Sequence, residues 1–116
     1  MIDTTHVKTE AASGVLIARI KCEKLSEYES LIVQNEISGL APGFNWKVAI
    51  DFDQVTIISS VGLGMLVSLN RLAKAAKGRI ALFGMNDSIR SVFKLTRLDS
   101  GFTIVVDHSA AVKALT

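Results

Sequence analysis

The sequence contains few of the residues that small proteins use for covalent or metal cross-links. Its 116 residues include one cysteine, one proline and two histidines. The single cysteine, Cys22, excludes an internal disulfide and predicts a reducing compartment. His6 and His108 lie far apart in the chain, with no HExxH motif and no cysteine cluster, so we expect no metal site. Cys22 is expected to be a small buried hydrophobic residue without a redox role.

Long apolar runs and a strong net charge are also missing. No apolar run approaches the ~20 residues that a membrane-spanning helix needs. The first ten residues, MIDTTHVKTE, lack the apolar core of a secretory signal. The 13 basic and 11 acidic residues give a net charge of only +2, which predicts no strong attraction to nucleic acid or membranes. We therefore expect a cytoplasmic protein that neither inserts into a membrane nor binds nucleic acid.

Apolar residues are abundant, and their pattern predicts the fold class. They make up 49% of the chain, which favours a sheet covered by helices. The length predicts one domain over residues 1–116. Strands are predicted over Val7–Glu10, Val15–Lys21, Trp46–Phe52, Arg79–Phe83 and Phe102–Val106, and helices over residues 26–39, 60–77, 86–95 and 110–115. The order ββαβαβαβα predicts an α/β fold with a mixed, mostly parallel sheet, whose first two strands form a hairpin.

Polar residues and glycines suggest where the helices begin and end. Ser26 and Glu29 have the spacing of a capping box at the start of the first helix, which carries Tyr28, Leu31 and Ile32 on one apolar face. Further expected caps are Gly78 at the end of the second helix, Asn86 or Asp87 at the start of the third, and Ser109 at the start of the last. The basic residues Arg71, Lys74, Lys77 and Arg79 are expected to form a solvated face.

The stretch Thr56–Gly64, TIISSVGLG, places two serines where a strand leads into a helix. Either Ser59 or Ser60 is expected to be the N-cap of that helix, and Gly62 and Gly64 are expected to allow close packing of the turn. The stretch fits a dinucleotide-binding loop poorly, because Val67 stands where the third glycine would be. It also fits a hydrolase nucleophile turn poorly, because Ile58 replaces the first glycine, although Asp99 and His108 follow in the order of such a triad. We therefore predict no catalysis and no bound cofactor.

The longer stretch Asp51–Gly64, DFDQVTIISSVGLG, resembles the signature of STAS domains, specifically of the bacterial anti-sigma-factor antagonists. That signature is a strand ending in aspartate, a loop with valine, and then Asp-Ser-Ser/Thr-Gly-Leu-Gly at the start of a helix. Three later segments, Gly78–Leu82, Ser88–Phe93 and Leu98–Phe102, resemble the strand, helix and link that follow in the family. The resemblance therefore covers nearly the whole chain.

The resemblance implies a non-enzymatic regulator, an anti-anti-sigma factor. Its unmodified form is expected to bind an anti-sigma serine kinase and so free a sigma factor. The kinase would then phosphorylate Ser60 with its own ATP, and a serine phosphatase would restore the unmodified form. The implied partner-binding residues are Asp51, Ser59, Ser60, Val61, Gly62, Leu63 and Met65. Met65 is expected to point outward, and Asp51 is either a partner contact or an ordinary residue at a strand end.

Two positions depart from the family pattern. Ser59 stands where the family has an aspartate, and Val61 stands where it has a small hydroxyl residue. The first departure removes a negative charge beside Ser60 and leaves Ser59 as a minor alternative phosphoacceptor. A second function therefore stays open, that of a non-phosphorylated STAS scaffold subunit in a stress-signalling or lipid-transport complex. A homodimer also stays open.

Overall fold

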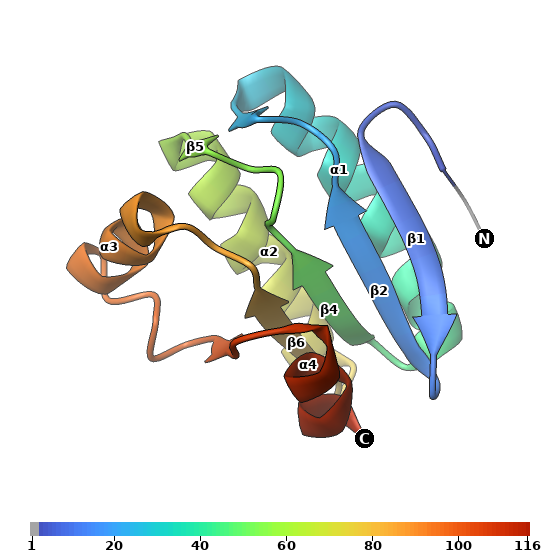
Figure 1. The fold of residues 1–116 in the computed structure, drawn as a ribbon. Coiled ribbons are helices and arrows are strands. Elements are labelled where there is room, and N and C mark those ends of the chain that lie inside the picture. Colours follow the sequence, from blue (N-terminus) through green and yellow to red (C-terminus); the bar gives the residue numbers. More distant parts are fainter. Residues whose placement is uncertain (1–2) are drawn as a thin grey trace.

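A computed structural model describes residues 3–116, and its main sheet has five strands within that range. These are β1 (Val7–Ala12), β2 (Val15–Ile20), β4 (Lys47–Asp51), β6 (Arg79–Phe83) and β7 (Thr103–Ile104). Their spatial order is β1-β2-β4-β6-β7, with β1 antiparallel to β2 and each further neighbour parallel (Figure 1). The predicted α/β fold and its mostly parallel sheet are therefore confirmed.

Helices cover the sheet from both sides. They are α1 (Glu27–Leu40), followed by the 3-10 helix η1 (Ala41–Phe44), and then α2 (Ser60–Ala75), α3 (Asp87–Leu95) and α4 (His108–Leu115). In Figure 1, α1 and α2 lie behind the sheet and α4 lies in front of it. No helix in residues 3–116 is long and apolar enough to cross a membrane.

The alternation of side chains along each strand builds two separate cores. Leu16 of β2 and Ile50 of β4 pack with Leu66 and Phe93 of the helices behind the sheet. Ile17 is the next residue of β2, and it belongs to the smaller cluster beneath α4. Since successive residues of a strand point to opposite faces, an almost continuously apolar strand such as β2 must be buried on both.

Two very short strands escape a prediction based on the sequence pattern. β3 (Lys24–Leu25) pairs in parallel with β5 (Ile57–Ile58), and Leu25 stands beside Ile58. A two-residue strand has no periodicity to detect, and its partner lies more than thirty positions away in the chain. The pair joins the segment that enters α1 to the segment that enters α2, so the two helices begin side by side.

The first helix differs from the prediction in two respects. Ser26 is its N-cap residue, but its hydroxyl donates a hydrogen bond to the Glu29 carboxylate rather than accepting one from a backbone N–H group. The apolar face that was expected is exposed, with Tyr28 at 69% and Leu31 at 63% of full exposure. The buried residues are instead Ser30, Val33 and Ile37. Ser30 can be buried because its hydroxyl donates to the Ser26 carbonyl oxygen within the helix.

The N-caps of α3 and α4 are an amide and a carboxylate. Asn86 caps α3 as one of the two predicted residues, since its side-chain oxygen accepts from the Ile89 N–H group at 2.8 Å. The prediction that Ser109 caps the last helix is wrong. The Asp107 carboxylate accepts from the Ala110 N–H group at 2.9 Å, and α4 therefore begins at His108. The final strand is correspondingly shorter than predicted and ends at Ile104.

The end of α2 uses its glycine in an unexpected way. Gly78 was predicted as the C-cap, but the left-handed residue is Lys77, with φ of 62°. The Gly78 N–H group donates to the Ala73 carbonyl oxygen at 2.7 Å, which closes the helix one residue beyond the left-handed position. A side chain at Gly78 would meet the Cβ atom and the carbonyl oxygen of Trp46, each at 2.4 Å. Glycine is thus required here for close packing.

Separate substitutions at Lys77 and Gly78 test these two assignments through the stability of the protein. Lys77→Gly should raise the free energy of unfolding by about 1 kcal/mol, because glycine adopts the left-handed conformation without a Cβ clash. Gly78→Ala should lower it by roughly 2 kcal/mol, because the backbone of Trp46 cannot move aside cheaply. Urea denaturation measures both changes. Equal effects of the two substitutions would contradict this assignment.

Candidate functional site

The carbonyl oxygen of Leu25 holds the turn that carries both serines. It accepts a hydrogen bond from the Ser59 N–H group at 3.1 Å and another from the Ser59 hydroxyl at 3.1 Å. The same hydroxyl accepts from the Gly62 N–H group at 3.1 Å, which makes Ser59 the N-cap of α2. The Ser59 side chain is therefore engaged as donor and as acceptor between β3 and α2.

Ser60 differs from its neighbour in every one of these respects. It is the first residue of α2 and its side chain is exposed. Within residues 3–116, no hydrogen bond involves its hydroxyl. The sequence left open which serine is the cap, and the geometry separates them. Of the two serines, Ser60 is the one whose hydroxyl has no partner among residues 3–116 and can meet an approaching protein.

The two glycines that follow also have different environments. A Cβ atom at Gly62 would lie 2.7 Å from the Leu25 carbonyl oxygen and 2.9 Å from Cγ1 of Ile58. A Cβ atom at Gly64 would meet nothing within 4 Å. Close packing therefore requires glycine at position 62, as predicted, and the same prediction is wrong for position 64. The missing side chain of Gly64 leaves open surface instead.

That open surface belongs to a groove between α1 and α2, with a volume of about 470 Å³. Its lining residues are Glu27, Ser30, Leu31 and Gln34 of α1 and Val61, Gly64, Met65 and Ser68 of α2. Leu31 and Val61 are 63% and 47% exposed, and Ile57, just before the serines, is 55% exposed. Ser60 thus lies next to an apolar groove that offers contact area to another protein. We call this surface, together with Ile57, the α1–α2 groove.

The remaining predicted contacts on α2 follow the helical period. Met65 is only 4% exposed, so the prediction that it points outward is wrong. Met65, Leu69 and Ala73 recur at the helical period, and all three are buried in the larger core. Leu63 is partly buried against the same core, whereas Val61 is exposed.

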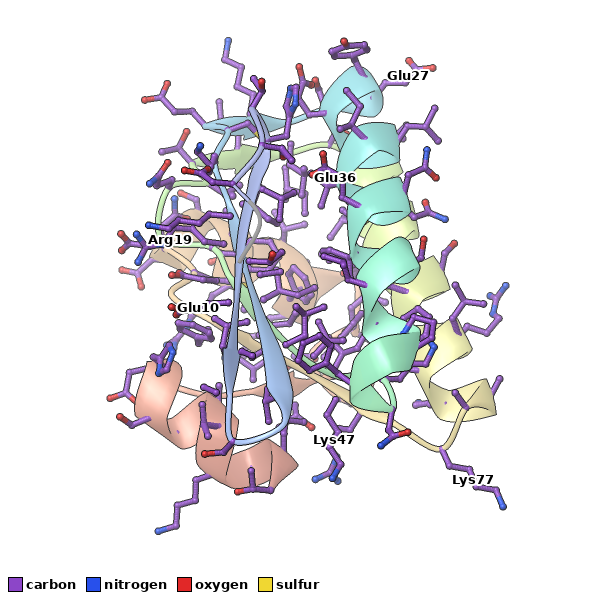
Figure 2. The ribbon with its side chains drawn as sticks, turned by 90° about the vertical axis from the view of Figure 1, so that its right-hand side faces the viewer. Glu10, Arg19, Glu27, Glu36, Lys47 and Lys77 are labelled. Atoms are coloured by element: carbon purple, nitrogen blue, oxygen red, sulfur yellow. The ribbon has the colours of Figure 1, made fainter. Side chains whose placement is uncertain are left out.

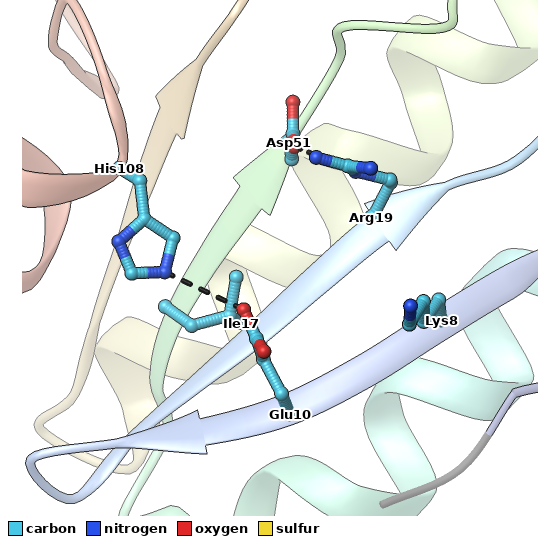
Figure 3. A pocket seen from close by; sticks show the side chains of 6 residues that line it. All are labelled: Lys8, Glu10, Ile17, Arg19, Asp51 and His108. Carbon is cyan, nitrogen blue, oxygen red and sulfur yellow. Dashed lines mark hydrogen bonds and ion pairs between the residues drawn. The ribbon is translucent and has the colours of Figure 1, made fainter.

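Asp51 ends β4 and faces away from α2. Its side chain is on the α4 side of the sheet, where Oδ2 accepts from Nε of Arg19 at 3.0 Å (Figure 3). Oδ1 accepts from the Asp53 N–H group at 2.9 Å and fixes the first turn of the loop towards β5. These contacts match those of a strand-terminating residue, and a contact with a partner stays a prediction.

The partners of Asp51 could not be found from the sequence alone. Arg19 is its in-register neighbour on the adjacent strand, a relation that only the sheet order creates. Gly84, with φ of 77°, lies so close that a Cβ atom there would be 2.8 Å from Oδ1 of Asp51. Figure 3 shows that His108 and Glu10, 3.5 Å apart, lie on the same face as this ion pair.

Cys22 lies just beyond β2 and is partly buried against the larger core rather than fully buried. Burial raises the pKa of its thiol above the usual value, and the negative charge of Glu29 adds to the effect. A raised pKa reduces the thiolate fraction at neutral pH, and the thiolate is the reactive species. The side chain therefore serves packing better than redox chemistry.

A protein-family model described as Mlab, STAS domain, matches residues 25–107, which include Leu25 of β3, the serine turn and α2. The chain belongs to the STAS-domain family. The match ends at Asp107, the residue that caps α4.

Solved structures of other STAS-like proteins have the same fold. A Thermotoga maritima protein described as a candidate anti-sigma factor antagonist is 24% identical, with a TM-score of 0.81 over 94% of this chain and 93% of that one. An anti-sigma-factor antagonist domain protein of Planctomyces limnophilus is 16% identical, with a TM-score of 0.83 over 98% and 100%. The Bacillus cell fate determinant SpoIIAA in its phosphorylated form is 18% identical, with a TM-score of 0.69 over 95% and 99%. A comparison with curated protein sequences found no match.

The two glycines of the STAS turn provide a matched pair of substitutions. Gly64→Ala should raise the free energy of unfolding by ~0.5–1 kcal/mol, because alanine is the better helix former and the site is open. Gly62→Ala should lower it by roughly 2 kcal/mol, because Leu25 and Ile58 stand in the way. Thermal unfolding followed by circular dichroism measures both. A stabilising Gly62→Ala would mean that β3 and α2 do not make this close contact.

Proposed function

We propose that this STAS domain is an anti-sigma-factor antagonist that binds an anti-sigma serine kinase, releases a sigma factor, and is switched by phosphorylation of Ser60. The observation that carries the proposal is the exposed Ser60 hydroxyl, free of hydrogen bonds within residues 3–116, beside the apolar α1–α2 groove. The names of several structural neighbours support it. One is an anti-sigma factor antagonist from Mycobacterium paratuberculosis, and SpoIIAA is known in both its unphosphorylated and its phosphorylated form.

The start of α2 would tolerate a phosphate group. A phosphoserine carries a charge of about −1.5 to −2 at neutral pH. The first N–H groups of a helix lack partners within the helix, and together with the helix dipole they stabilise anions. In this turn the Gly62 N–H group already has a partner, because it donates to the Ser59 hydroxyl. Phosphorylation should therefore leave the fold intact and act on the surface.

The same charge would weaken the docking of a partner. The groove beside Ser60 is lined by the apolar side chains of Leu31 and Val61 and, at one end, by the carboxylate of Glu27. A partner that covers this surface must strip water from the new phosphate, and any acidic group opposite Ser60 is repelled. A 100- to 1000-fold loss of affinity corresponds to only ~3–4 kcal/mol, which one buried charge can supply.

The replacement of the family aspartate by Ser59 is compatible with this switch. Serine and aspartate are both good N-cap residues, because each accepts a hydrogen bond from the second or third N–H group of a helix. Ser59 makes that bond to Gly62, so the turn keeps its geometry without the carboxylate. What changes is the charge that a kinase meets beside Ser60. Ser59 itself would be a poor phosphoacceptor, since its hydroxyl is occupied on both sides.

A second candidate function is a STAS scaffold subunit that is not phosphorylated. The family model that matches the chain bears the name Mlab, and the aspartate and small hydroxyl residue of the phosphorylated antagonists are absent at positions 59 and 61. Such a subunit would use the same α1–α2 groove to join a stress-signalling or lipid-transport complex. The two functions then differ in whether a change at Ser60 alters binding.

A phosphorylation assay separates them. The purified protein is incubated with ATP and each anti-sigma serine kinase of its organism, and its intact mass is measured. We expect a gain of one phosphate in the wild type and in Ser59→Ala, and none in Ser60→Ala. Ser59→Ala should also lose about 1 kcal/mol of stability as a lost cap, which verifies that the variant tests the assigned role.

Binding to the same kinases completes this test. Ser60→Asp should bind at least ~10-fold more weakly than wild type, or about 1.4 kcal/mol, whereas Ser60→Ala should bind normally. Both variants should unfold within roughly 1 kcal/mol of wild type, because the helix start tolerates either side chain. Equal binding by all three proteins, with no gain in mass, would favour the scaffold subunit.

The groove itself can be tested with a pair of leucines. Leu31→Asp should weaken binding to the kinase at least ~10-fold, because it puts a charge into an apolar interface. Leu95→Asp is the matched control, since Leu95 is 84% exposed on α3 and lies outside the groove. Surface plasmon resonance measures both. Weakening by the control as large as that by Leu31→Asp would place the docking surface elsewhere.

A further inference from the structure

Four cationic side chains lie at one end of the molecule, where β4 and β6 begin and α2 finishes. Lys47 is the exposed first residue of β4, and Arg79 is the first residue of β6. Lys74 lies in the last turn of α2, and Lys77 follows the end of that helix. Figure 2 shows Lys47 and Lys77 at the lower end of the molecule and Glu27 at the upper end. The acidic residues Glu27, Glu29, Asp51 and Asp87 lie where helices begin or a strand ends, at the upper end of the parallel units. We call the four cations the basic end.

Fold stability does not account for the basic end. Lys47 and Arg79 are in-register neighbours on adjacent strands, an arrangement in which like charges repel. None of the ion pairs within residues 3–116 includes any of the four cations. The lysines are not needed as helix caps either. The Ala73 carbonyl oxygen accepts from Gly78 at 2.7 Å, and that of Lys74 accepts from Lys77 at 3.0 Å.

Lys77 adds a second cost. It occupies a left-handed conformation, with φ of 62°, at a position where helices usually end in glycine. A lysine in this conformation is less stable than a glycine would be. The dipole of α2 offsets part of the repulsion at Lys74 and Lys77, but it does nothing for the pair formed by the two strands. The basic end therefore retains positive charge that the fold alone would disfavour.

A pocket opens beside two of these cations, Lys74 and Arg79. Its volume is about 210 Å³, and it lies between α2, the start of β6 and the loop before β7. Lys74 and Arg79 line it together with the hydroxyl residues Ser100 and Thr103 and the backbone of Gly101. Asn70 fixes one wall, because its Nδ2 atom donates to the Gly101 carbonyl oxygen at 2.9 Å. None of the described residues that line the pocket has a carboxylate.

We propose that the pocket between Lys74 and Arg79 binds a phosphate group. An arginine guanidinium can donate two parallel hydrogen bonds to phosphate oxygens, and a lysine supplies a compact positive charge. Thr103, which also lines the pocket, has a hydroxyl that can act as a further donor. At about 210 Å³ the pocket is too small to enclose a nucleotide, so it takes inorganic phosphate or the phosphate of a larger molecule that stays outside. Phosphate could thus come from a soluble phosphomonoester or from a lipid headgroup.

The test begins with inorganic phosphate, titrated into the ¹⁵N-labelled full chain at constant ionic strength, with chloride as the balancing ion. We expect saturable shifts of the N–H signals of Gly78, Arg79 and Gly101. Arg79→Ala and Lys74→Ala should each weaken the affinity at least ~10-fold, since each removes a charge-assisted hydrogen bond. Lys113→Ala, an equal loss of charge on α4, should leave the affinity unchanged.

Vesicles distinguish the two sources of phosphate. Cosedimentation compares phosphatidylcholine vesicles with and without phosphatidic acid, using wild type and the same three variants. Binding that needs phosphatidic acid, Lys74 and Arg79 identifies a lipid headgroup as a ligand, even if free phosphate binds too weakly to saturate. The proposal fails if neither probe binds saturably, or if Lys113→Ala weakens binding as much as the pocket variants. Either result leaves the role proposed for Ser60 untouched, because that surface lies at the other end of α2.

Discussion

One backbone oxygen, that of Leu25, sets the geometry on which the candidate site depends. It accepts both the N–H group and the hydroxyl of Ser59, and the close approach of Gly62 leaves no room for a side chain beside it. Because Leu25 belongs to β3 and Ser59 follows β5, the contact also fixes the spacing between the starts of α1 and α2. Losing it would move the cap, the groove and Ser60 together.

The two faces and the two ends of the sheet carry different functional side chains. Side chains of β4 alternate between the core beneath α2 and the face beneath α4, so Asp51 points away from the helix that carries Ser60. Along the other direction, the parallel strands run from one end of the molecule to the other, and the helices between them run back. This polarity places acidic helix starts and Ser60 at one end and the cations of α2, β4 and β6 at the opposite end.

Much of the fold followed from local patterns. β6 has the bounds expected from its apolar run, and Asn86 caps α3 through the short-range hydrogen bond that amides prefer. The errors came where a local pattern had two solutions. On α1, Tyr28 and Leu31 looked like a buried face, yet Val33 and Ile37 meet the sheet, and only the direction in which the helix packs decides between them. Met65 was misplaced for the same reason, since only the packing of α2 against the sheet decides which side of the helix faces inward.

By itself the sequence determined the order of the four helices and the five strands of the main sheet, the family, and the stretch that holds the site, because these depend on the spacing of apolar residues and on a short motif. Tertiary structure decided which serine is engaged and which is free, since the hydrogen-bond partner of Ser59 lies 34 residues away. It also decided why Gly62 and Gly78 must be glycine, whereas Gly64 need not be. Those distinctions arise from contacts between segments that are distant in the chain, and no local pattern encodes them.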